Sequence, residues 1–159
     1  TGINLFNDNG KLRKEVYQIL EQVKNAGIIL ATGHFSFPEV ESLSKAAYEM
    51  NFDKILVNHP GIIFQRFSVE QQKELLKYGA FLEHSYCRPP HTLPVDELVH
   101  TLRQLDTEKI VLATDLGQPQ NPDPVDGMEE LISQLVRNGF TKSEIDQMVI
   151  ENPAYLLCK

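Results

Sequence analysis

Residues 27–36 read GIILATGHFS, an apolar run that ends abruptly at a glycine and a histidine. Residues 109–118 read KIVLATDLGQ and repeat the phrase, with an aspartate following the threonine in place of the glycine and histidine. Short continuous apolar runs are typical of β-strands that are buried on both faces, as in parallel sheets. We therefore expect two strands of one parallel sheet, with His34 and Asp115 at their carboxyl ends.

Two further runs of the same kind, KILVN and AFLEH, bring the strand starts to residues 27, 54, 80 and 109. Apolar residues at helical spacing precede the first run and follow every run. The expected helices lie within residues 10–27, 38–51, 68–79, 94–106, 127–139 and 141–152. Repeated strand–helix units with right-handed crossovers form a parallel sheet with helices outside. The sequence predicts an α/β fold of four consecutive βα units.

Bulk composition restricts the classes of partner. A chain of 159 residues with 42% hydrophobic residues is long enough for one domain with its own core, and we expect a single domain over residues 1–159. The net charge of −7 argues against a nucleic-acid partner, because a phosphate backbone requires a basic surface. No apolar run is long enough to span a membrane, and the first residues do not resemble a signal peptide. Only two cysteines occur, so we expect a cytoplasmic protein.

Metal-competent side chains recur where the expected strands end. His34 follows the first strand, His59 the second and Asp115 the fourth. Carboxyl ends of parallel strands share one edge of the sheet, where α/β folds place their ligand sites. Two imidazoles and one carboxylate suit a divalent ion, with Zn as the first choice and Mn or Fe as alternatives. We expect His34, His59 and Asp115 to bind the ion, and Asp115 to carry the proton as the catalytic residue.

Ordinary structural roles remain open for the same residues. A histidine after a strand often only bonds its loop, and an aspartate often begins a turn or caps a helix. Asn58, Thr32 and Thr114 are also open to this interpretation. The shared position of three ligand-type residues favours the metal site over independent loop roles.

Three further residues are candidates for holding a small-molecule substrate. Arg66 and Arg88 lie in long segments after the second and third strands, and a guanidinium matches a carboxylate in two places. A solvated surface position explains these arginines equally well. His84 ends the third strand and completes the expected substrate-binding set.

The order of these motifs resembles the second half of the amidohydrolase superfamily barrel. In that family the fifth and sixth strands end in metal-binding histidines and the eighth ends in an aspartate. LATGH (30–34), LVNHP (56–60) and LATDLG (112–117) match these places, FLEHS (81–85) stands as the seventh strand, and NPAYLL (152–157) resembles the family's ending. More narrowly, the chain resembles a poorly characterised branch of cytosolic TIM-barrel metal-dependent hydrolases. The resemblance implies half of a (β/α)8 barrel and attack of metal-activated water on a carbonyl or phosphoryl centre.

Two departures from that family define the alternatives. The sequence has no His-x-His pair, which the family carries on its first strand, and it supplies four βα units where a barrel needs eight. We therefore expect either the C-terminal half of a longer protein or a half-barrel that pairs as a homodimer, and this segment alone to be inactive. A half-barrel without a partner has open sheet edges. The alternative function is a non-catalytic module that binds a ligand or a protein.

Overall fold

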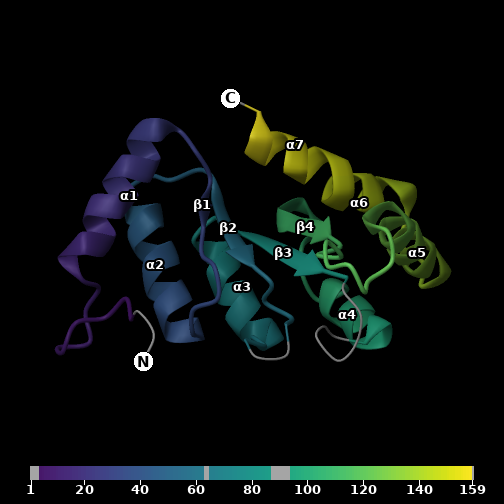
Figure 1. Cartoon of the computed structure of the whole chain (residues 1–159), viewed down its shortest axis with the longest axis horizontal. Helices are drawn as coiled ribbons and strands as arrows, with labels where there is room; N and C mark the ends of the chain where they lie inside the picture. Colours follow the sequence, from purple (N-terminus) through teal and green to yellow (C-terminus); the bar gives the residue numbers. More distant parts are fainter. Residues whose placement is uncertain (1–3, 63–64, 87–93, 159) are drawn as a thin grey trace.

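The computed structural model describes residues 4–62, 65–86 and 94–158. Its centre is a four-stranded parallel sheet in the order β1-β2-β3-β4 (Figure 1). The strands are β1 (Leu30–Ala31), β2 (Ile55–Asn58), β3 (Phe81–Ser85) and β4 (Ile110–Ala113). Chain order equals spatial order, so every connection joins neighbouring strands. The α/β fold with four parallel strands is confirmed.

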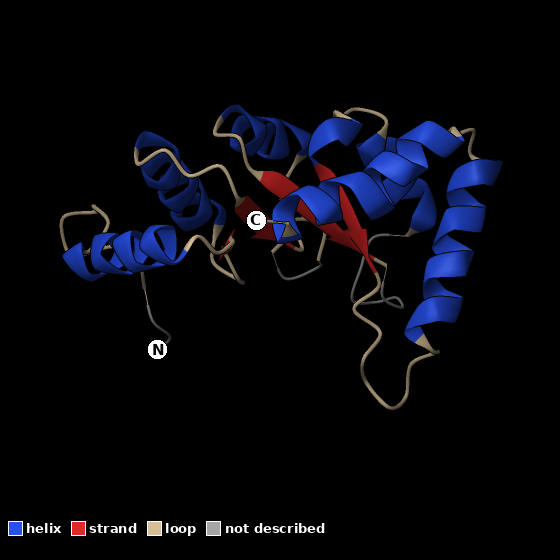
Figure 2. Ribbon diagram, turned by 90° about the horizontal axis from the view of Figure 1, so that it is seen from above, coloured by secondary structure: helices blue, strands red, loops and turns tan. Residues whose placement is uncertain are grey.

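Helices alternate with the strands and continue after β4. They are α1 (Lys14–Ala26), α2 (Phe37–Glu49), α3 (Val69–Lys77), α4 (Val95–Leu102) and α5 (Pro124–Arg137), followed by α6 (Lys142–Asp146), the π-helical turn η2 (Gln147–Glu151) and α7 (Asn152–Leu157). The 3-10 turn η1 (Thr107–Lys109) precedes β4. Figure 2 shows the helical segment that ends at the C-terminus passing in front of the strands. Among the described residues, no helix combines the length and apolarity needed to cross a membrane.

Local sequence signals set several helix ends. Ser36, Ser68 and Thr141 each begin a helix with a capping box, in which the side chain and the third helical residue satisfy each other's backbone N–H groups. Helix α1 ends at Gly27, whose φ of 63° is the left-handed conformation that glycine adopts without steric cost.

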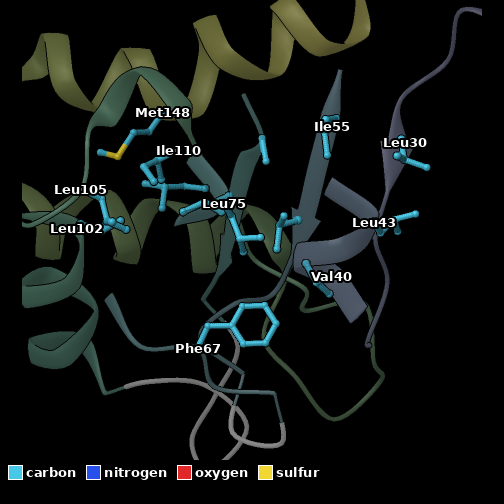
Figure 3. Packing of buried hydrophobic residues seen from close by; sticks show 14 of the residues in the cluster. Leu30, Val40, Leu43, Ile55, Phe67, Leu75, Leu102, Leu105, Ile110 and Met148 are labelled. Carbon is cyan, nitrogen blue, oxygen red and sulfur yellow. The ribbon is translucent and has the colours of Figure 1, made fainter. Parts of the chain in front are cut away.

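The main core lies between one face of the sheet and the helices (Figure 3). Alternate strand residues supply it, among them Leu30, Ile55, Val57, Leu82 and Ile110. The opposite face carries a second, smaller cluster of Phe81, Val111 and Leu156, the last of which belongs to α7. Ile29 and Leu56 at the edge of this cluster are only partly buried. The second face is therefore less completely covered than the first.

Strand β1 is shorter than the expected strand over residues 27–32. Its pairing with β2 covers Leu30 with Ile55 and Ala31 with Leu56. Residues 27–29 precede Leu30, the first residue of β1 that pairs with β2, so they are not part of the sheet. Ala31 is exposed although it lies within a strand. Strand β1 is thus a short edge strand.

Candidate functional site

Polar residues gather where the parallel strands end. Gly33 and His34 follow β1, Asn58 ends β2 and His59 follows it, and Ser85 ends β3. The strands are in parallel register, with Asn58 opposite Glu83, so these ends are adjacent. This edge of the sheet brings two of the three predicted metal ligands together.

His34 and His59 form a stacked pair of imidazoles. Their ring centroids are 5.3 Å apart and the planes differ by 24°. His34 is exposed, whereas His59 is half-buried. Two imidazoles in this arrangement present ring nitrogens from the ends of neighbouring strands to the same region of the molecule.

The end of β3 holds His59 at two points. The backbone N–H of His59 donates to the carbonyl of Glu83 over 3.0 Å, and Nδ1 of its ring lies 2.7 Å from Oγ of Ser85. The residue has a φ of 49°, a left-handed conformation that costs a non-glycine residue about 1 kcal/mol or more. Such strained positions concentrate at functional sites, where the surrounding structure maintains them.

A second network orders the turn that presents His34. Oδ1 of Asn58 accepts from the backbone N–H of Gly33 over 3.0 Å, and Nδ2 of Asn58 donates to Oε2 of Glu83 over 2.6 Å. The backbone N–H of Asn58 donates to Oγ1 of the buried Thr32. Asn58 and Thr32 thus form hydrogen bonds that join the ends of β1 and β2. The side chain of Asn58 also links Glu83 to the turn that precedes His34.

Asp115 follows β4 in an exposed position and has a φ of 53°. Across the described ranges 4–62, 65–86 and 94–158, no group of three His, Cys, Asp or Glu side chains lies close enough to hold a metal ion. The structure therefore brings His34 and His59 together but does not add Asp115 to them in this conformation.

Arg66 and His34 line the same pocket. This open pocket has a volume of about 500 Å³ and is also lined by Phe37, Gln65 and Phe67. The guanidinium of Arg66 pairs with the carboxylate of Glu97 in α4. The predicted substrate arginine thus shares a pocket with His34, one member of the imidazole pair, and its charge is balanced by an acidic neighbour.

His84 lies away from this group. It alternates with Glu83 along β3 and shares the helix-covered side of the sheet with Leu82. Its side chain is fully buried, Nε2 has no hydrogen-bond partner in the described parts of the chain, and burial lowers the pKa of the imidazole to about 4. The imidazole of His84 is therefore a neutral core group. Arg88, the remaining substrate candidate, lies outside the described residues.

Sequence reasoning missed two contributors. Ser85 contacts His59, and Glu83 supports Asn58, yet neither was among the predicted site residues. The alternation of side chains along β3 contains a partial signal, because residues 83 and 85 share the face opposite His84.

The protein is thus an α/β chain with a pair of histidines at the carboxyl edge of its parallel sheet. The model of a family of unknown function, DUF6282, matches residues 1–83, just over half of the chain. The chain belongs to this family. The matched segment contains His34, His59 and Glu83. A comparison with curated proteins gave no match.

Proposed function

We propose that the chain forms part of a metal-dependent hydrolase, in which His34 and His59 hold a divalent ion. The observation that supports this most is the stacked imidazole pair at the ends of adjacent parallel strands. Zn is the first choice for two imidazoles, and Mn or Fe are the alternatives. When bound, the ion would make a water acidic enough to attack a carbonyl or phosphoryl centre.

The ligand set fits the ion in part. Ser85 occupies Nδ1 of His59, which leaves Nε2 as the ligand atom. Catalytic zinc sites use three protein ligands and keep one position open for water. The described residues supply two of them in one place, so the proposed site requires a third ligand to approach the pair. We assign that place to Asp115, which would also receive the proton from the attacking water.

We also propose that the sheet is one half of a (β/α)8 barrel, completed by a second copy of the chain or by an N-terminal half. The helix-covered face of the sheet is well buried, whereas Ala31 is exposed on β1, and Ile29 and Leu56 are only partly buried on the other face. Helix α7 covers the part of this second face around Phe81 and Val111, and in a closed barrel the remaining part would line the interior. A partner half that covers it would also supply ligands beyond the imidazole pair.

The substrate of the proposed reaction is a small molecule bound in the pocket beside His34. Arg66 borders that pocket and provides a cation for an anionic group. The carboxylate of Glu97 would have to release Arg66 for a full charge contact. Arg88 remains a proposed second cation, whereas His84 is left out because it is buried on the other side of the sheet.

Metal analysis of purified protein tests the proposal. The wild-type chain, loaded with zinc and then desalted, is expected to retain zinc, and the double variant His34→Ala, His59→Ala is expected to lose it. His100→Ala is the matched control, because His100 is exposed in α4, away from the strand ends. Equal zinc content in the wild type and the double variant would contradict the proposal.

A non-catalytic ligand-binding module is the second candidate. The lack of a three-residue ligand group in the described parts of the chain favours it. In this case a ligand in the pocket beside His34 depends on Arg66 and not on zinc. Small-molecule binding that survives removal of zinc by a chelator, and is lost in Arg66→Ala, would favour the module over the hydrolase.

A further inference from the structure

Ser85 contacts the ring of His59, and the proposed function assigns this serine no role. Its Oγ lies 2.7 Å from Nδ1 of His59, within normal hydrogen-bond range. Ser85 is buried and comes from β3, whereas His59 follows β2. The contact therefore joins two strands at the edge where the imidazole pair lies.

Pairing with β4 fixes the position of Ser85. Ser85 lies opposite Ala113 in the register of the two strands. The next backbone N–H, that of Tyr86, donates to the carbonyl of Ala113 over 2.8 Å. The backbone that carries the Ser85 hydroxyl is therefore held by its pairing with β4 and not by His59.

The same strand also restrains the backbone of His59, through the 3.0 Å hydrogen bond to the carbonyl of Glu83. With the backbone held by Glu83 and the ring held by Ser85, the imidazole has one orientation relative to β3. The protein has stabilised this orientation against the cost of the positive φ at His59.

We propose that Ser85 is a positioning residue that fixes the tautomer of His59, with the proton on Nδ1 and the lone pair on Nε2. Nδ1–H donates to Oγ of Ser85, and Nε2 is left unprotonated. This inference rests on the proposed function, because a neutral imidazole binds a metal through its unprotonated nitrogen. Hydrogen bonds from the second ring nitrogen orient ligand histidines and commonly change metal affinity by about 10- to 100-fold.

The tautomer is measured directly by long-range ¹H–¹⁵N correlation spectra of the imidazole rings, recorded without metal. We expect protonated Nδ1 and unprotonated Nε2 for His59 in the wild type. In Ser85→Ala the ring is expected to shift toward the Nε2–H form that a free histidine side chain prefers. In Ser85→Thr, which keeps a hydroxyl and suits a strand, the wild-type pattern is expected to return.

Zinc affinity provides the second readout. By competition with a chromogenic chelator, Ser85→Ala is expected to bind zinc about tenfold more weakly than the wild type and Ser85→Thr. Ser44→Ala is the matched control. Ser44 is a buried serine of α2 whose hydroxyl has no hydrogen-bond partner in the described parts of the chain. Its removal is expected to leave both the tautomer and the zinc affinity unchanged.

The outcomes separate this inference from the proposed function. A protonated Nε2 in the wild type, or an Nδ1 proton retained in folded Ser85→Ala, would overturn the role of Ser85 whatever the zinc result. A serine-dependent Nδ1 proton in a chain that binds no zinc would support the role of Ser85 and contradict the proposed hydrolase.

Discussion

Asp115 and His59 share a backbone conformation that is unusual for residues with a side chain. Their φ angles are 53° and 49°, in the left-handed region. Glycine follows β1 at the corresponding place, since Gly33 has a φ of 65°. Three strand ends therefore turn through the same conformation, and at two of them the chain carries a proposed ligand where glycine would be less strained.

Substitution at Asp115 should expose this strain. Asp115→Gly is expected to have a free energy of unfolding about 1 kcal/mol higher than Asp115→Ala, because alanine in this conformation places Cβ against the backbone. Urea unfolding of the two variants measures the difference. Equal stabilities, or a more stable alanine variant, would show that the left-handed conformation is not present in solution.

His84 predicts a pH dependence of stability. Its pKa is about 4 in the folded protein, because burial disfavours the charged form, against about 6.5 in an unfolded chain. Between these values the unfolded state binds more protons, so stability falls as the pH falls. Going from pH 7 to pH 5, the loss attributable to His84 should be about 2 kcal/mol.

The matched variant for this prediction is His84→Leu, which fills the buried position with a group that does not titrate. Urea unfolding at pH 7 and pH 5 is expected to show the smaller pH dependence in the variant. An equal fall in both proteins would mean that the buried imidazole of His84 does not have a lowered pKa.

At the scale of single elements, the order of strands and helices was predictable from sequence. Apolar runs and helical spacing predicted all four strands and the helices between them. The structure has capping boxes at Ser68 and Thr141, where α3 and α6 begin. The length of β1 was not predictable, because it depends on where β2 begins to pair. The apolar run indicates which residues are able to form a strand, but not how many of them pair with β2.

The candidate site was predictable in part, for a related reason. His34 and His59 lie together because adjacent parallel strands end together. The contact of Ser85 with His59, and the chain from Glu83 through Asn58 to Gly33, depend on the register between β2 and β3, which the sequence does not display. Asp115 follows β4, which β3 separates from β2. A position at the same edge of the sheet therefore does not bring Asp115 within reach of the two histidines among the described residues.

The bridge formed by Asn58 should contribute measurably to stability. Asn58→Ala removes the acceptor for the N–H of Gly33 and the donor to Glu83, so the free energy of unfolding is expected to fall by about 1–3 kcal/mol. Faster amide hydrogen exchange at Gly33 should accompany it. Glu83→Gln keeps an acceptor for Asn58 and is expected to lose less; a loss as large as that of Asn58→Ala would contradict the bridge.

At the scale of the whole molecule, the proposed half-barrel predicts association. Light scattering coupled to size exclusion is expected to give about twice the chain mass of 18.1 kDa. Ala31→Lys places a charge on the exposed residue of β1 and should return the monomer mass. Lys45→Glu, on the exposed side of α2, is the control and should remain associated. A clean wild-type monomer would contradict closure by a second copy.

The rings of His34 and His59 meet because the strands they follow are parallel and adjacent. Zinc-edge anomalous diffraction from crystals of the chain soaked in zinc locates any bound ion without reference to activity. We expect an anomalous peak about 2.0–2.1 Å from Nε2 of His59, shared with a ring nitrogen of His34. Zinc elsewhere, or no peak beside the pair in crystals that leave both rings open to solvent, would contradict it.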